Sequence, residues 1–181
     1  DKVGGVSSFG KDEKTNKWLP LNINGIPTGG DHPCYISLNE KENFAVVANY
    51  TGGSLSVMPI DERGVIGNAA QLVQHRGSSV VADRQSSPHV HTAIFSPKDN
   101  YVVVTDLGTD MVQAYTFNAN KEMPVDTTKI ISIKMPVGTG PRHIAFHPTK
   151  SVFYVIGELN GMVSVHAFNK RNIAILQRVK A

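Results

Sequence analysis

The chain has 181 residues, of which 40% are hydrophobic and 18% are charged, the latter below the roughly 25% of an average domain. This composition indicates a compact folded protein and excludes a disordered one. Eighteen basic and fifteen acidic residues give a net charge of +3 without a basic cluster, so no nucleic-acid partner is expected. No apolar run reaches the roughly 18 residues of a membrane span, and one cysteine cannot form a disulfide framework.

The opening segment, residues 1–31, contains two short strand-like runs at 6–9 and 18–21. We interpret these runs as the last two strands of a repeat unit, so residues 1–31 are the end of one unit. The segment begins without methionine, charged leader or apolar targeting core. We therefore expect this chain to be part of a longer protein whose natural N-terminus it does not include, and we expect a cytoplasmic location.

Three further units, residues 32–83, 84–137 and 138–181, share one layout of four short β-branched or apolar runs separated by turn residues. The sequence predicts strands in these units at 35–38, 44–49, 54–58 and 71–73, then at 92–95, 101–106, 111–115 and 130–133, then at 143–146, 152–157, 162–166 and 173–176. The first runs end at Leu38, Phe95 and Phe146, which are 57 and 51 residues apart.

Four strands per unit and a repeat of about 54 residues, with no helical periodicity, are typical of an all-β protein of the β-propeller class with four-stranded antiparallel blades. A β-sandwich built from similar strands is the alternative, and the near-constant spacing favours the propeller. The chain would then cover about three and a half blades of a single domain. We expect the remaining half of the propeller to come from the same parent protein or from a symmetry mate.

The repeat alignment also predicts where a site lies. In an antiparallel meander, the first strand begins and the second strand ends at the same rim of the blade. The beginnings of the first strands carry Cys34, His91 and Arg142, and the ends of the second strands carry Asn49, Asp106 and Glu158. We therefore expect a polar site beside the central channel. Strict alternation along the strands would turn His89 and His143 to the face opposite His91 and Arg142.

These residue types suit chemistry on a small anionic ligand. His91 can act as a general base near neutral pH, and Arg142 offers a planar set of donors for a phosphate, a carboxylate or an oxyanion. Glu158 could orient either residue, while Asn49, Asp106 and His143 could bind the substrate. The alternative is structural: His91 bonded to backbone and Arg142 paired with Glu158. No metal or cofactor is expected, because the His89–His91 pair lacks a third ligand.

Several stretches resemble a known family. They are residues 49–54, 87–93 and 106–110, and above all the Gly-Pro-Arg-His element within 138–143, followed by 146–148 and 158–160. Together they look like the seven-bladed propeller type of 6-phosphogluconolactonase, a family related to fungal carboxy-muconate lactonizing enzymes. The resemblance implies hydrolysis of the ring ester of a sugar 1,5-lactone phosphorylated at C6, that is, 6-phospho-D-glucono-1,5-lactone to 6-phosphogluconate.

The resemblance also implies site residues. In the related lactonizing enzymes a His, an Arg and a Glu of these motifs are proposed to form the site, and they correspond to His91, Arg142 and Glu158. A further Arg from a later blade has no counterpart in this chain. A non-catalytic propeller that binds a partner through its rim and a ring-closing enzyme of the muconate type remain alternatives. Tyr50 is the one aromatic residue predicted at the mouth, which favours a small polar ligand.

Overall fold

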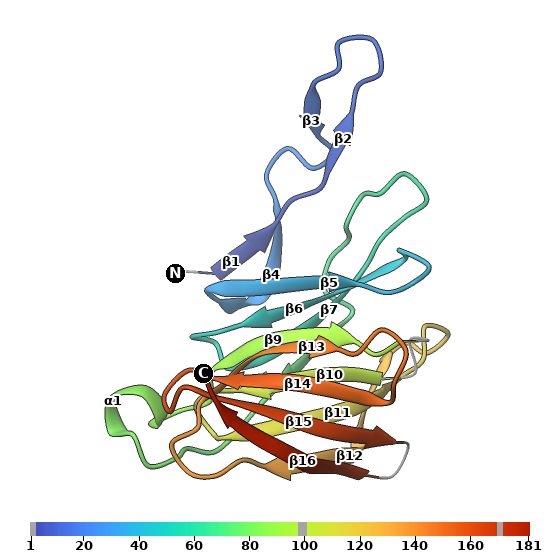
Figure 1. Cartoon of the computed structure of the whole chain (residues 1–181). Coiled ribbons are helices and arrows are strands. Elements are labelled where there is room, and N and C mark those ends of the chain that lie inside the picture. The colour runs from blue at the N-terminus through green and yellow to red at the C-terminus, as the bar shows by residue number, and fades with distance from the viewer. Residues whose placement is uncertain (1–2, 98–100, 170–171) are drawn as a thin grey trace.

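The computed structural model describes residues 3–97, 101–169 and 172–181 of the chain. Residues 98–100, which belong to the turn predicted after Phe95, lie outside this description. The described residues form sixteen strands and one short helix (Figure 1). The protein is therefore nearly all β, which confirms the predicted class.

Three four-stranded antiparallel sheets follow one another along the chain, each with its strands in chain order. The first contains β5 (Pro33–Leu38), β6 (Phe44–Asn49), β7 (Ser54–Pro59) and β8 (Gln71–Gln74). The second contains β9 (Val90–Phe95), β10 (Tyr101–Asp106), β11 (Met111–Phe117) and β12 (Val125–Lys134). The third contains β13 (Pro141–Phe146), β14 (Val152–Gly157), β15 (Met162–Asn169) and β16 (Asn172–Lys180). These sheets confirm the four-stranded blades expected from the repeats.

The sheets are held together by face-to-face packing of their β-branched residues. Strand β10 reads Tyr-Val-Val-Val-Thr-Asp and is buried along its whole length, as expected for a strand covered on both faces. One core cluster includes Val46 and Val104 and lies between the first and second sheets. Another includes Val103 and Phe153 and lies between the second and third. Each fully buried side chain of this kind contributes roughly 1.5–3 kcal/mol, so stacking of neighbouring blades fixes the rims relative to each other.

The N-terminal segment forms a long hairpin whose two arms pair twice. Strand β1 (Val3–Val6) pairs with β4 (Ile26–Asp31), and β2 (Phe9–Lys11) pairs with β3 (Trp18–Pro20), which projects away from the sheets (Figure 1). The sequence predicted strands at 6–9 and 18–21. The first falls across the end of β1 and the start of β2, the second corresponds to β3, and β4 was not predicted. Strand β3 is exposed along its whole length, and Trp18 is 67% exposed. Its sequence therefore has no alternating burial pattern from which the strand bounds could be predicted.

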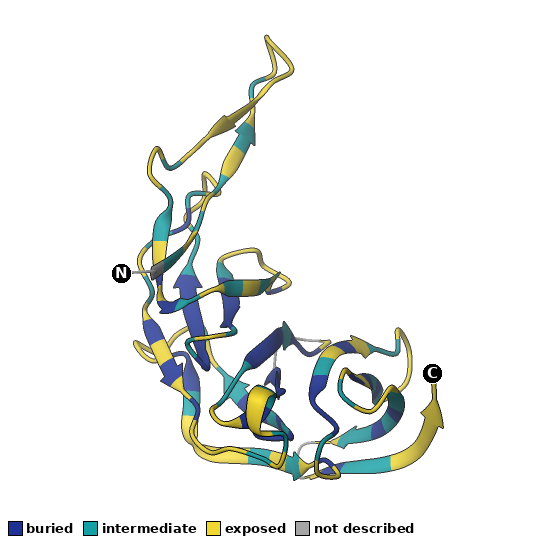
Figure 2. Ribbon diagram, turned by 90° about the vertical axis from the view of Figure 1, so that its left-hand side faces the viewer, coloured by how far each residue is buried: buried dark blue, intermediate teal, exposed yellow. Residues whose placement is uncertain are grey.

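The first strands of the three sheets lie next to one another, in the order β5, β9 and β13 (Figure 1). The sheets follow an arc, with most of the buried residues between neighbouring sheets (Figure 2). The short helix α1 (Ala82–Gln85) lies in the connection between the first and second sheets. In the described part of the chain, no helix is long and apolar enough to cross a membrane.

Candidate active site

Strands β5, β9 and β13, which are the first and inner strands of the three sheets, each carry a β-bulge at the equivalent point. In β5 the pairing with β6 shifts register between Pro33 and Tyr35, and in β13 the pairing with β14 shifts between Pro141 and His143. In β9 the shift lies between Val90 and Thr92, which pair with the adjacent residues Asp106 and Thr105 of β10. The residues within these shifts are Cys34, His91 and Arg142, the three that the repeat alignment placed at equivalent positions. A bulge adds one residue and redirects the side chains around it. At this rim the side chains therefore do not follow the strict alternation between the two faces of a regular strand.

The bulge at Arg142 is held by two buried hydroxyl groups of the neighbouring sheet. Thr92 Oγ1 and Thr105 Oγ1 both donate to the Arg142 carbonyl oxygen, at 2.7 and 2.6 Å. Both threonines are fully buried, so these bonds form away from water. The carbonyl oxygen of His91 is approached in the same way by Cys34 Sγ at 3.4 Å. Contacts between blades thus fix the backbone that presents His91 and Arg142.

His91, Arg142 and Glu158 meet at this rim. The Arg142 Nε atom lies 2.9 Å from His91 Nε2, to which it donates, and 2.9 Å from Glu158 Oε2. Glu158 follows directly after strand β14, and its backbone N–H donates to the carbonyl oxygen of Gly140 at 2.9 Å. The His91 side chain is buried, whereas the side chains of Arg142 and Glu158 are 44% and 26% exposed. The histidine therefore lies beneath two charged groups that remain accessible to a ligand.

A second arginine, Arg84 of helix α1, completes the cluster. Its Nη2 atom donates to Glu158 Oε1 and also to the Tyr50 hydroxyl group at 3.2 Å. Glu158 thus lies between two guanidinium groups, one from the third sheet and one from the helix. Arg84 could not be predicted by aligning the repeats, because the connection between β8 and β9 that carries it has no equivalent in the other units. Its only signal was its position a few residues before His89 and His91.

Two aromatic rings, those of Tyr50 and His143, pack against His91, and a third ring, that of His89, packs on Tyr50. Tyr50 stacks on His89 with ring centroids 4.6 Å apart, and contacts His91 edge to face at 5.6 Å. His143 contacts His91 edge to face at 4.9 Å. The expectation that His89 and His143 face away from His91 and Arg142 is therefore wrong. The bulges change the alternation just where that expectation relied on it.

Burial and the neighbouring arginine keep His91 neutral. Desolvation, followed by the charge of Arg142 and by His143, lowers the pKa of His91 to about 4. An arginine N–H can only donate, so Nε2 of His91 accepts and Nδ1 carries the hydrogen of the neutral ring. The Nδ1 atom is buried and has no partner among the described residues. The proton-accepting atom of His91 is thus the one that Arg142 covers.

The other groups of the cluster keep their ordinary charges. Partial burial alone would raise the pKa of Glu158, but the hydrogen bond and charge of Arg84, with Arg142, lower it. The pKa of Arg84 is raised by its hydrogen bonds with Tyr50 and Glu158. Two cations and one anion therefore leave one positive charge in excess. Cys34 is not an activated nucleophile, since desolvation raises the pKa of its thiol to about 11.

Asn49 and Asp106 do not join this exposed cluster. Asn49 is fully buried and its Nδ2 donates to the hydroxyl groups of Ser54 and Ser56, at 3.1 and 2.8 Å. Asp106 is 1% exposed, and its Oδ2 lies 2.9 Å from His75 Nδ1. A substrate hydroxyl cannot reach either side chain in this arrangement. They hold the ends of strands β6 and β10 in place.

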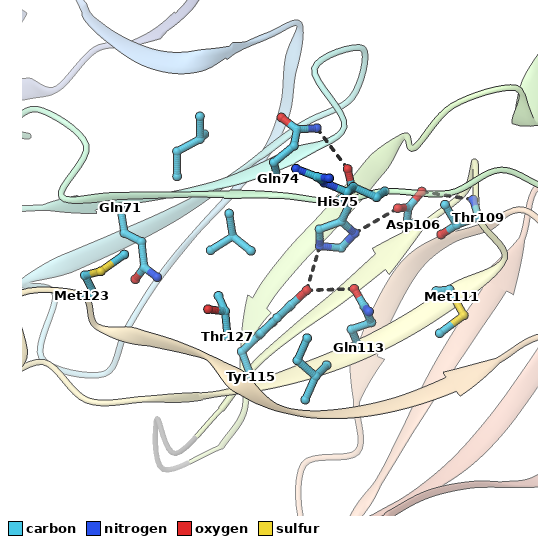
Figure 3. Close-up of a pocket in the computed structure, with 14 residues that line it drawn as sticks. Gln71, Gln74, His75, Asp106, Thr109, Met111, Gln113, Tyr115, Met123 and Thr127 are labelled. Atoms are coloured by element: carbon cyan, nitrogen blue, oxygen red, sulfur yellow. Dashed lines mark hydrogen bonds and ion pairs between the residues drawn. The ribbon is translucent and has the colours of Figure 1, made fainter.

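Asp106 belongs to a buried chain of hydrogen bonds beside a groove of about 450 Å³ between the first and second sheets (Figure 3). His75 lies between Asp106 and Tyr115, whose hydroxyl group lies 3.0 Å from His75 Nε2 and donates to Gln113 at 2.8 Å. The Oδ1 atom of Asp106 accepts the backbone N–H of His89 at 2.8 Å. These hydrogen bonds thus support the backbone of His89, next to the cluster. No three His, Cys, Asp or Glu side chains of the described residues gather as metal ligands.

Fold and site together define a β-propeller with an arginine–histidine–glutamate cluster at one end of its inner strands. A family model described as "Lactonase, 7-bladed beta-propeller" matches residues 1–181. The chain therefore belongs to the seven-bladed β-propeller lactonase family.

Curated relatives agree with this assignment. The chain is 31% identical over 173 residues to a 6-phosphogluconolactonase of Formosa agariphila, covering 96% of this chain and 48% of the relative. It is 35% identical over 169 residues to a 6-phosphogluconolactonase of Bacillus subtilis, covering 93% of this chain and 46% of the relative. The chain spans about half the length of the curated relatives it matches.

Solved structures show the same partial coverage. A periplasmic gluconolactonase of Pseudomonas aeruginosa is 30% identical with a TM-score of 0.89, covering 100% of this chain and 50% of that one. A putative 6-phosphogluconolactonase of Bacteroides fragilis is 31% identical with a TM-score of 0.88, covering 98% and 50%. This chain thus matches about half of a lactonase propeller, as the count of three and a half blades in seven predicted.

Proposed function

We propose that this protein hydrolyses the ring ester of a sugar 1,5-lactone, most favourably 6-phospho-D-glucono-1,5-lactone, to the open acid. The observation that carries the proposal is the pair of arginines around Glu158 beside a neutral histidine. The excess positive charge of that cluster suits an anionic lactone, and the names of the relatives indicate the same substrate class.

The residues of the cluster can supply each step of the hydrolysis. Arg142 is 44% exposed, so its guanidinium group can turn from His91 to the lactone carbonyl oxygen. His91 Nε2 then takes a proton from a water molecule, whose oxygen attacks the carbonyl carbon. Arg142 stabilises the resulting oxyanion. When the bond between the carbonyl carbon and the ring oxygen breaks, His91 returns the proton to the ring oxygen, which becomes a hydroxyl group.

The depressed pKa of His91 is compatible with this role. A histidine whose pKa is about 4 is in its basic form throughout the neutral range. The charge of Arg142 is the second cause of that depression after burial, so an anion beside Arg142 raises the basicity of His91 when the substrate binds. A general base of this kind typically contributes about 10²- to 10⁴-fold, and one oxyanion donor about 10²- to 10³-fold.

The proposal is tested with the full-length protein and three substrates: 6-phosphogluconolactone, unphosphorylated gluconolactone and a carboxy-muconate. We expect hydrolysis of the sugar lactones above the spontaneous rate, fastest for the phosphorylated one. Ring closure of the muconate without lactone hydrolysis would support the lactonizing alternative. If none of the three compounds is converted, the result would support the alternative of a non-catalytic propeller that binds a partner. The cytoplasmic location stays a prediction, since one structural neighbour is named as periplasmic.

A further inference from the structure

Arg84 is held in a fixed position by the residue that follows it. Gln85 is fully buried, and its Nε2 atom donates to the Leu107 carbonyl oxygen and to Asp110 Oδ1, both at 2.8 Å. Its Oε1 atom accepts the backbone N–H of Val81 at 3.1 Å. These bonds tie the single turn of helix α1 to the end of strand β10. The side chain of Arg84 is 42% exposed and extends from this anchored turn toward Glu158.

The excess positive charge of the cluster comes from Arg84. The charges of Arg142 and Glu158 offset each other, and His91 between Arg142 and the core is neutral. Two buried carboxylates behind the cluster are engaged elsewhere: Asp106 by His75, and Asp110 by Ser79 and by the backbone N–H groups of Gly138 and Gly140. Asp83, which precedes Arg84 in helix α1, is exposed to solvent. No second carboxylate of the described residues pairs with Arg84. A bound anion can therefore share this guanidinium group with Glu158.

The two arginines occupy different places relative to His91. Arg142 contacts His91 directly, whereas Arg84 lies on the other side of Glu158 and contacts Tyr50. A lactone whose carbonyl group lies at His91 and Arg142 can therefore direct a substituent that projects from its ring toward Arg84. In a hexose 1,5-lactone, C6 is attached to C5 next to the ring oxygen, and a phosphoryl group on C6 extends beyond the ring on that side.

We propose that Arg84 binds the phosphoryl group on C6 of the substrate and determines the preference for the phosphorylated lactone, while Arg142 serves the carbonyl group. This inference rests on the proposed function and names the subsite of the same cluster. Glu158 holds both guanidinium groups in position when no substrate is bound. Tyr50 is a positioning residue, because its hydroxyl group fixes the direction of Arg84.

The test measures kcat and KM of the full-length protein for 6-phosphogluconolactone and for unphosphorylated gluconolactone. The variant is Arg84→Gln, and the matched control is Arg76→Gln, which removes the same charge from an exposed residue of the same connection. We expect Arg84→Gln to lower the ratio of the two kcat/KM values by at least about tenfold, mainly through KM, as expected for one lost charge-assisted hydrogen bond. Arg76→Gln should leave this ratio unchanged.

A second variant and a binding measurement keep the test independent of folding defects. Tyr50→Phe retains the ring that packs on His89 and should lower the same ratio by a smaller factor. Calorimetry should show that Arg84→Gln binds 6-phosphogluconate more weakly, with little change for gluconate. An unchanged ratio in both variants, with both lactones hydrolysed, would overturn the subsite alone. If the unaltered protein hydrolyses neither lactone, the proposed function itself is wrong.

Discussion

At the scale of single residues, the cluster depends on a histidine that stays neutral next to a guanidinium group. His91 accepts a hydrogen bond from Arg142 and packs against the rings of Tyr50, in the turn after β6, and of His143, in β13. The resulting pKa of about 4 predicts how the proposed lactone hydrolysis depends on pH.

We expect kcat/KM for gluconolactone to remain constant from neutral pH down to about pH 5 and to fall only as His91 is protonated near pH 4. Gluconolactone is the right substrate here, because its phosphorylated form has a group that titrates near pH 6. Initial rates across this range provide the measurement. An acid limb centred near 6.5, the ordinary value for histidine, would show that a solvated residue and not buried His91 is the base.

Arg142→Lys should be far from conservative. The guanidinium Nε atom contacts both His91 and Glu158 while the side chain stays 44% exposed, and a lysine ammonium cannot reproduce that geometry. We expect KM for 6-phosphogluconolactone to rise at least about tenfold and kcat to fall as well. Near-normal kinetics together with a lower melting temperature would identify Arg142 as a structural ion-pair residue.

The sequence could predict His91, Arg142 and Glu158 as neighbours because strand ends at a common rim follow from the repeat alone. It could not predict Arg84, which lies in a connection without repeats, nor the contacts of His143 with His91 and of His89 with Tyr50. It also could not separate buried polar residues from exposed ones. Asn49 and Asp106 occupy the same rim positions, but they bond to the strand ends behind it.

At the scale of elements, the β-bulge of strand β13 is the device that presents Arg142. Thr105 donates to the Arg142 carbonyl oxygen and accepts the backbone N–H of Thr92 at 3.2 Å, so it links two inner strands at the bulge. Repeats and turn residues were sufficient to predict the four-stranded sheets. Bulges leave no such pattern, since the extra residue is an ordinary member of the strand sequence.

Replacing both Thr92 and Thr105 by Val should loosen this bulge. The lost hydrogen bonds leave a buried carbonyl oxygen unpaired, which costs about 1–3 kcal/mol of unfolding free energy. We also expect kcat/KM to fall, because Arg142 is displaced. Thr116→Val is the control, since it makes the same change on strand β11 opposite Tyr101, at the end of β10 away from the bulge. Equal effects of the two changes in urea unfolding and in kinetics would contradict this role of the bulge.

At the scale of the whole molecule, stability should depend on pH through buried histidines. His166 is fully buried, stacks on Phe153 with centroids 4.9 Å apart, and lies 2.8 Å from Ser164 Oγ. Burial, followed by the charge of Arg178, lowers the pKa of His166 to about 4, as burial does for His91.

Between pH 6.5 and 4 the unfolded chain takes up protons on these histidines that the folded chain does not. The unfolding free energy should therefore fall as the pH is lowered through this range, by up to about 3 kcal/mol per histidine. Urea unfolding at pH 7, 5 and 4 measures the effect. His166→Gln should show a weaker pH dependence than the unaltered protein, and identical slopes would refute the assignment.

The N-terminal hairpin shows where prediction from repeats ends. Its outer strands β2 and β3 pair only with each other among the described strands, and Phe9, Trp18 and Ile23 remain exposed. That the other half of the propeller covers this end of the arc stays a prediction, consistent with relatives about twice as long.

The proposed role of His91, with Arg142 and Glu158, is to hydrolyse the ring ester of a sugar lactone. The most direct measurement is the rate of 6-phosphogluconolactone hydrolysis by the full-length protein and by His91→Asn, each against the spontaneous rate. We expect clear acceleration by the unaltered protein and a loss of about 10²- to 10⁴-fold in kcat for the variant, with KM largely retained. Equal rates for the two folded proteins would contradict it.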